Sequence, residues 1–231
     1  MDLADIRNEV SRIIGLDTTA AGTDETLVDA WANEAVIDIL LETRCYVSSA
    51  TTSLTVDEGD YTLDSDILHV VDVHLTSGGV RYRLKQVAPQ QLLDMRVTDN
   101  GEAASPISHF AVAGSNLLMV YPIPSSADSM TLYYVPRPTV MSTGTNDPST
   151  TTYGGIPSEF HRAIVKYVEA EAADYMDDQT SQQGDRYRAD YGRWLGKIHK
   201  YVNQKGNTET TAFEVRGRSY PPHDPSTDLG C

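Results

Sequence analysis

Two histidines and two aspartates lie in the stretch from Asp66 to His74, and imidazole and carboxylate groups together can hold a transition metal. The histidines, His69 and His74, stand at positions of opposite parity, with Asp72 between them. Such positions on one regular β-strand point to opposite faces, so the two rings share an ion only if the strand contains a bulge. We therefore expect no metal site in this stretch.

A second acidic group precedes this strand, and calcium is the ion it would suit. It consists of Asp57, Asp60, Asp64 and Asp66. The spacing lacks the EF-hand pattern, and charged hairpin turns are common, so we expect a plain turn. The sequence also lacks a Gly-x-Ser-x-Gly elbow, a phosphate-binding loop ending in Lys-Ser/Thr, and a His-Glu-x-x-His motif. Cys45 lies on a broad apolar face, where an inert thiol is expected. The sequence predicts no enzyme and no cofactor.

Charge excludes general binding to nucleic acid. The chain of 231 residues has a net charge of -15, with ordinary hydrophobic content of 40% and a mean hydropathy of -0.35. Residues 1–80 hold 16 acids against three arginines, a balance of 16 - 3 = 13 negative charges. Tight DNA binding needs basic residues that release condensed counterions. Acidity serves either solubility or a surface that repels a polyanion sliding past it. With no signal peptide and no apolar run that could span a bilayer, we expect a soluble protein made in the cytoplasm, without membrane contact.

Helices are predicted at the N-terminal end, over residues 2–14 and from Thr23 or Asp24 to about Cys45. The second helix has Val28, Trp31 and Ile39 on one face, and further apolar residues widen that face. Such breadth indicates burial against neighbouring helices or a neighbouring subunit, so Trp31 is a candidate interface residue.

The apolar period changes from about 3.6 to 2 between residues 46 and 136. Strands are expected over residues 67–75, 80–84, 107–113, 117–121 and 130–135, with a short helix over 87–97. The Ser77-Gly78-Gly79 turn would join the first two strands in a hairpin. Residues 137–156 follow as a Thr/Ser/Pro/Gly linker without periodicity.

Residues 157–205 read as two helices split by Gly184, with tyrosine-rich stripes that we expect to pack within the subunit. Gly192 and Gly196 stand one turn apart on the second helix. Glycine there is costly, so its use is either close approach of another backbone or mere tolerance. We take Gly192, Gly196 and the adjacent Arg193 as subunit-interface candidates.

The last 26 residues, 206–231, are polar and contain prolines, so they cannot form a core of their own and are either disordered or ordered by a partner. Their candidate partner-binding residues are Phe213, Val215, Arg216, Arg218 and Tyr220, because aromatic and arginine side chains are typical interface anchors. The predicted fold class is α+β: residues 1–45 and 157–205 form one helical bundle, residues 46–136 are an inserted antiparallel β domain, and residues 206–231 are an extended arm.

Three sets of short motifs, in this order and spacing, resemble head–tail adaptor (connector, or head-completion) proteins of tailed bacteriophages. They are Gly-Asp-Tyr-Thr-Leu at 59–63 with Asp-Ile-Leu-His-Val at 66–70; the strands at 110–117 and 132–134 with Tyr-Pro-Ile-Pro at 121–124; and Ile-Pro-Ser-Glu-Phe-His at 156–161 with the helices after it. The resemblance covers about residues 24–205.

The resemblance implies a structural virion protein in the neck between capsid portal and tail. It implies a ring, commonly of twelve copies, under the portal protein, with tail or neck proteins below and genome DNA passing through the channel without specific binding. The C-terminal arm would then reach the portal. A tail-terminator or tail-tube protein remains an alternative, and a carbohydrate- or host-binding β module is another, which would expose aromatic residues on its sheet and stay monomeric.

Overall fold

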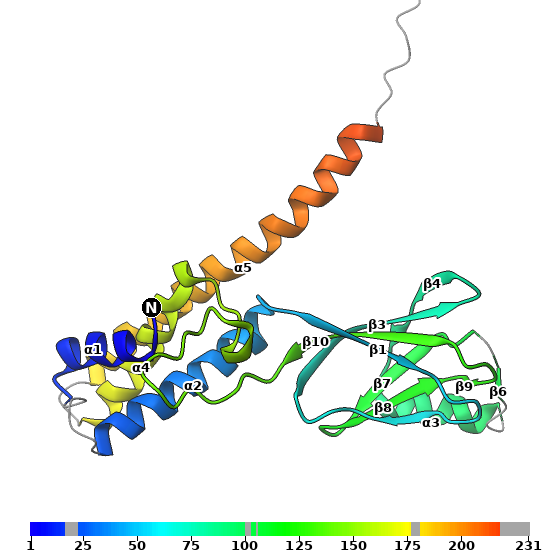
Figure 1. Ribbon diagram of the computed structural model, residues 1–231, viewed down its shortest axis with the longest axis horizontal. Helices are drawn as coiled ribbons and strands as arrows, with labels where there is room; N and C mark the ends of the chain where they lie inside the picture. The colour runs from blue at the N-terminus through cyan, green and yellow to red at the C-terminus, as the bar shows by residue number, and fades with distance from the viewer. Residues whose placement is uncertain (17–22, 100–102, 105, 177–180, 218–231) are drawn as a thin grey trace, which may run out of the picture.

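The computed structural model describes residues 1–16, 23–99, 103–104, 106–176 and 181–217, with the backbone alone at residues 23, 181–182 and 205–217. It shows an elongated molecule with a helical part at one end and a β part at the other (Figure 1). The chain crosses between the two parts after helix α2 and again after strand β10. This arrangement confirms the predicted α+β fold, in which both ends of the chain build the helical part.

The helical part consists of α1 (Leu3–Ile14), α2 (Thr23–Thr43), α4 (His161–Tyr175) and α5 (Ser181–Gly217). Helix α1 begins with a capping box, in which the Asp2 and Asp5 side chains each accept from the other's backbone amide, and ends at Gly15 with φ +84°. Helix α4 packs against α1, α2 and α5 and so lies at the centre of the bundle. The core includes Leu3, Ile6, Val10, Val28, Ile39, Ile156, Ile164, Val168 and Ile198.

The β part is a sandwich of two four-stranded sheets, in the orders β1-β10-β3-β4 and β2-β8-β7-β5. The strands are β1 (Ser48–Ser53), β2 (Asp60–Thr62), β3 (Ile67–Ser77), β4 (Val80–Arg83), β5 (Lys85–Gln86), β6 (Ala103–Ala104), β7 (His109–Ala113), β8 (Leu117–Tyr121), β9 (Ile123–Pro124) and β10 (Ser129–Pro136). Between the sheets lies a second core that includes Val70, Val73, Leu75, Phe110, Leu118 and Met130. Pairing is antiparallel, as predicted, except in the two-residue parallel pairs β5–β7 and β6–β9.

Helix α3 (Pro89–Thr98) covers the outer face of strands β7 and β8, where Leu92 packs against Ala111 and Met119. The expected helix at 87–97 is thus present, with Pro89 at its first position. Arg96 attaches α3 to the sheet, because its guanidinium donates to the carbonyl oxygens of Gly59 at 2.6 Å and Val120 at 2.8 Å.

The stretch expected to be a linker, residues 137–156, lies along the helical bundle as a strap. Met141 is buried, and its amide donates to the Asn33 side chain at 2.7 Å. The carbonyl of Asn146 accepts from the Leu3 amide at 2.9 Å. Two short 3-10 helices, η1 (Thr151–Tyr153) and η2 (Ser158–Phe160), lead into α4. These contacts attach the strap to α1 and α2, so it contributes to the bundle.

Candidate assembly interface

The inner face of α5 closes the helical core. Ile198 is fully buried, and Trp194 and Leu195 pack against the same core from partly buried positions. Tyr201 meets Phe160 edge-to-face with ring centroids 5.1 Å apart. As expected from the aromatic stripe, this face of α5 is occupied within the subunit.

Two tyrosine hydroxyls at the α4–α5 contact lie beside carboxylates of α2. Tyr191 donates to the carboxylate of Asp38 at 2.5 Å, and burial, followed by Asp38, raises the pKa of Tyr191. Burial, with Glu34 and Glu171 nearby, raises the pKa of Tyr167 to about 12. The phenols therefore stay neutral and hold the helices together, which is a structural role.

A buried ion pair lies where α4 packs against α5. Glu169 is completely buried and accepts from the Lys166 ammonium at 2.5 Å, and that ammonium also lies 5.2 Å from the centroid of the Tyr187 ring. One oxygen of Glu169, Oε1, has no hydrogen-bond partner. Breaking such a pair leaves an uncompensated charge, so both residues are tied to this packing.

The outer face of α5 around Gly192 and Gly196 is exposed to solvent and carries no side chains at these two positions. Gly192 and Gly196 are exposed, and a Cβ added at either would meet nothing within 4 Å. Arg193 beside them has a side chain that is 77% exposed and donates to Asp190 at 2.8 Å. Within the subunit, these glycines are therefore not needed for close packing, and their role at a subunit interface stays a prediction.

Gly184, unlike Gly192 and Gly196, lies against another helix. A Cβ there would lie 2.6 Å from the Asp174 carboxylate and 3.9 Å from the carbonyl of Ala170, both on α4. Sequence reasoning read Gly184 as a break between helices. It lies inside α5, near the helix start, where it lets α4 and α5 approach.

Trp31 is partly covered by its own chain. Its ring meets Tyr175 edge-to-face at a centroid distance of 5.9 Å, and it packs against the helical core. Tyr175 itself is 55% exposed and the adjacent Met176 is 42% exposed. The Tyr175–Met176 end of α4, with Trp31 beneath it, is therefore one exposed apolar surface of the helical part.

The predicted partner-binding arm differs in its first half from the expectation. The helix that was expected to end at 205 continues to Gly217, so the backbone at Phe213, Val215 and Arg216 is helical. This segment projects away from the rest of the molecule (Figure 1). Arg218 and Tyr220 lie outside the described residues.

Strand β3 is not a regular strand, so its residues do not alternate strictly between the two faces. Register shifts between Tyr133 and Tyr134 and after Val135 show that β3 is bulged, and His69 and His74 therefore lie on the same face, opposite Val135 and Thr131 of β10. Four residues of β10 separate these positions, roughly 13 Å, so the rings still do not converge.

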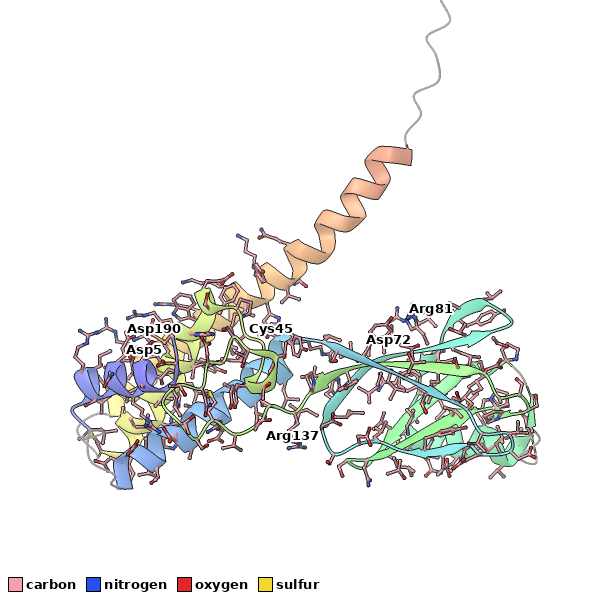
Figure 2. The ribbon with its side chains drawn as sticks, in the orientation of Figure 1. Asp5, Cys45, Asp72, Arg81, Arg137 and Asp190 are labelled. Atoms are coloured by element: carbon pink, nitrogen blue, oxygen red, sulfur yellow. The ribbon has the colours of Figure 1, made fainter. Side chains whose placement is uncertain are left out.

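His74 has a different partner. His74 Nε2 lies 3.2 Å from Asp72, which also accepts from Arg83 Nε at 2.9 Å, and the two hydrogen bonds hold the pKa of Asp72 below its usual value despite burial. Figure 2 shows Asp72 and Arg81 near each other on the β3–β4 hairpin. This is a network of paired side chains across the sheet.

The remaining candidates for chemistry are also engaged in structural contacts. Asp60 accepts from Arg96 at 2.8 Å, and Asp57 occupies a turn with φ +64°. Among the described residues, no group of three or more His, Cys, Asp or Glu could hold a metal ion. Burial raises the pKa of the Cys45 thiol, which disfavours the nucleophilic thiolate.

A cavity of about 290 Å³ opens between strands β1 and β2 and is lined in part by Thr52, Glu58 and Tyr61. A second, of about 340 Å³, lies beside Asp72 and Arg83 and extends to Phe110. Neither brings together a nucleophile, a base and an oxyanion donor. Among the described strand residues, Tyr82 is the most exposed aromatic, with 40% of its surface accessible. A carbohydrate-binding sheet would expose several aromatic side chains together.

In the described parts of the chain, no helix has both the length and the apolar character needed to cross a membrane. No curated protein matches the sequence. The sequence profile of one family, described as SU10 adaptor protein, matches residues 1–217 and thus both the helical and the β part. This agrees with the resemblance to phage head–tail adaptors and supports a structural virion protein. The chain belongs to the SU10 adaptor protein family.

Proposed function

We propose that this protein is the head-to-tail adaptor that forms a ring under the portal, joins the capsid vertex to the tail, and leaves a channel for DNA. The observation that carries the proposal is the length of α5. Its last described contacts with the core come from Tyr201 and Val202. The helix then continues to Gly217, which adds roughly 20 Å at 1.5 Å per residue.

This projecting half of α5 needs a partner. Packing of one face supplies most of the stability of helices in proteins, and the described core contacts of α5 end at Val202. The segment also begins with Gly206, Asn207 and Thr208, which are poor helix formers. Its anchors are Phe213, Val215 and Arg216, with Arg218 and Tyr220 beyond the described residues. The portal is the partner we assign to it, because the arm is the part of the chain that reaches farthest from the body.

The ring contacts are assigned to two different surfaces of the helical part. One is the bare face of α5 at Gly192, Arg193 and Gly196, where another backbone has room to approach. The other is the apolar end of α4 at Tyr175 and Met176. A cyclic ring uses heterologous contacts, in which one surface meets a different surface of the next copy. Two unlike exposed surfaces satisfy that requirement.

DNA would pass through this ring without being held. The first 80 residues carry most of the excess negative charge, although some of it is neutralised: Arg7 pairs with Asp29, Nη2 to Oδ2 at 2.5 Å, and with Glu25. Asp5 on α1 is exposed, and Figure 2 shows it on the surface of the helical part. We assign the acidic surface to the channel wall because repulsion keeps a polyanion from adhering.

The arm is tested by two deletions measured for binding to assembled portal rings. Deleting residues 206–231 should leave a folded protein, because the described core contacts of α5 end at Val202. It should no longer bind portal, because the arm is missing. Deleting residues 218–231 alone is the matched variant and separates the helical half of the arm from the rest. Undiminished portal binding by the longer deletion would contradict the assignment of the arm.

The ring is tested separately by the mass of the protein alone and after mixing with portal. Assembly on mixing is the expected result, even if the protein alone is monomeric. A complex with one or two copies per portal ring would rule out a ring of adaptors.

A further inference from the structure

Among the described strands, the β part has two sheet edges without a pairing strand, and these two edges fit each other. In the sheet β1-β10-β3-β4 every neighbouring pair is antiparallel, so β1 and β4 are its edges. Because the sheet has an even number of strands, β1 and β4 run in opposite directions. A second copy placed beside the first in the same orientation therefore brings β4 of one copy next to β1 of the other in antiparallel alignment.

The β4 edge has free backbone groups at two residues. The Leu84 amide donates to the Val73 carbonyl at 2.9 Å. By alternation along the strand, the backbone groups of Arg81 and Arg83 point away from β3. All four residues of β4 are exposed.

The β1 edge matches it. The Leu54 amide donates to the Asp128 carbonyl at 2.8 Å, so the backbone groups of Ser49, Thr51 and Ser53 point away from β10 by the same alternation. These side chains share the outer face of the sheet with Arg81 and Arg83, because the cross-strand partners of both sets, such as Thr131 and His74, lie on that face. Pairing the two edges therefore keeps one continuous outer face.

Strand β1 lacks the charges and prolines that usually protect an exposed edge, and the two arginines of β4 are directed away from its edge. Strand β1 reads Ser-Ser-Ala-Thr-Thr-Ser, without a charge or a proline. The arginines of β4 lie back over their own sheet: Arg83 pairs with Asp72 at 2.9 Å, and Arg81 bonds to the hydroxyl of Tyr133 with its guanidinium carbon 5.5 Å from that ring's centroid. They leave the edge open.

We propose that in the assembled ring β1 of each copy pairs with β4 of the next, so that the outer sheets join into one continuous β belt. This rests on the proposed ring. A β1–β1 pair would leave β4 uncovered, and a β4–β4 pair would bring four arginines together. Four strands at about 4.8 Å give roughly 19 Å of sheet per copy, so a ring of about twelve copies closes a belt of about 230 Å circumference. The short pairing explains how copies remain separate until the ring aligns them.

Disulfide trapping tests the belt. Thr51→Cys is combined with Arg83→Cys in one variant and with Arg81→Cys in another, both with Cys45→Ala and Cys231→Ser. Within one chain β10 and β3 separate β1 from β4, roughly 14 Å, which a disulfide cannot span. Rings formed on the portal protein are oxidised and run on a non-reducing gel, and one of the two registers should give a ladder of multiples.

The matched control is Thr52→Cys with Arg83→Cys, since Thr52 pairs with Met130 on the inner face and should give no ladder. Electron microscopy of the same samples counts the rings. Intact rings without a ladder from either double variant would overturn the belt and leave the ring proposal standing. Cross-linking of the single Thr51→Cys variant to itself would also overturn it. Absence of rings, with the wild-type chain as well, would overturn both proposals.

Discussion

Substitutions at Gly192 and Gly196 should affect the free protein and the assembly in opposite directions. Both residues are exposed inside α5, and an added Cβ at either meets nothing within 4 Å. Replacing glycine by alanine in an exposed helix interior gains about 1 kcal/mol per position, so the double alanine variant should be about 2 kcal/mol more stable. For a protein of this size that raises the melting temperature by roughly 4–8 °C.

Assembly should show the opposite effect when the side chain is larger. Leucine is nearly as good a helix former as alanine, so Gly192→Leu with Gly196→Leu keeps most of the stability gain. If another backbone approaches this face, the leucines hold it away and the ring fails to form. Denaturant unfolding of the free protein gives the first quantity, and mass photometry after mixing with portal gives the second.

A control variant separates stability from the surface. Asn8→Ala lies at an exposed position inside α1, far along the chain from α5, and should add about 0.6 kcal/mol without changing assembly. Rings formed by the double leucine variant at wild-type concentrations would refute the assignment of this face to a subunit contact. Failure of the alanine variant to stabilise the free protein would refute the description of the face as open.

Three further predictions concern the fold on which assembly depends. His161→Ala should lower the free energy of unfolding, measured by urea titration, by about 2–4 kcal/mol. The buried ring nitrogens of His161 lie 2.9 Å from the carbonyl oxygens of Met1 and Ile156, and both carbonyls would lose their partner. An unchanged urea midpoint would contradict this. Gly154→Ala should destabilise more than Gly114→Ala: both have positive φ, but only at Gly154 would the Cβ clash, 2.7 Å from Val36. Tyr167, with its pKa raised from 10.0 to about 12, stays protonated in the folded protein at a pH where the tyrosine of the unfolded chain ionises. Its stabilisation is therefore complete below pH 10 and lost as the pH rises towards 12. Tyr167→Phe should reduce this alkaline loss of stability, and an equal slope of unfolding free energy against pH in both proteins would refute the role of Tyr167.

Local signals predicted many elements because they act within a few residues. Pro89 at the first helical position marks the start of α3, and Gly78-Gly79, both with positive φ, form the turn between β3 and β4. The two helical ends were predicted to pack together because the chain runs from helices to strands and back to helices.

The parts that were missed depend on residues distant in the sequence. The bulges in β3 arise from its pairing with β10, so the parity argument about His69 and His74 could not detect them. The strap looked like a linker because its buried residues, such as Met141, have no period, and its contacts are with Asn33 and α1. The end of α5 was placed too early because residues 206–231 are polar and contain prolines, whereas elongation of an existing helix costs far less than nucleation.

The proposed lateral contacts are small, and this size has a consequence for the order of assembly. The glycine face around Gly192 and the β4 edge of four residues are short surfaces compared with those of a stable interface. Once the arms are bound side by side on a portal ring, however, contacts between neighbouring copies become effectively intramolecular and gain the high local concentration that such linkage provides. Weak lateral contacts then close the ring on the portal, while the same contacts remain open in free protein. A ring that formed readily without portal would require a much larger lateral interface than these surfaces offer.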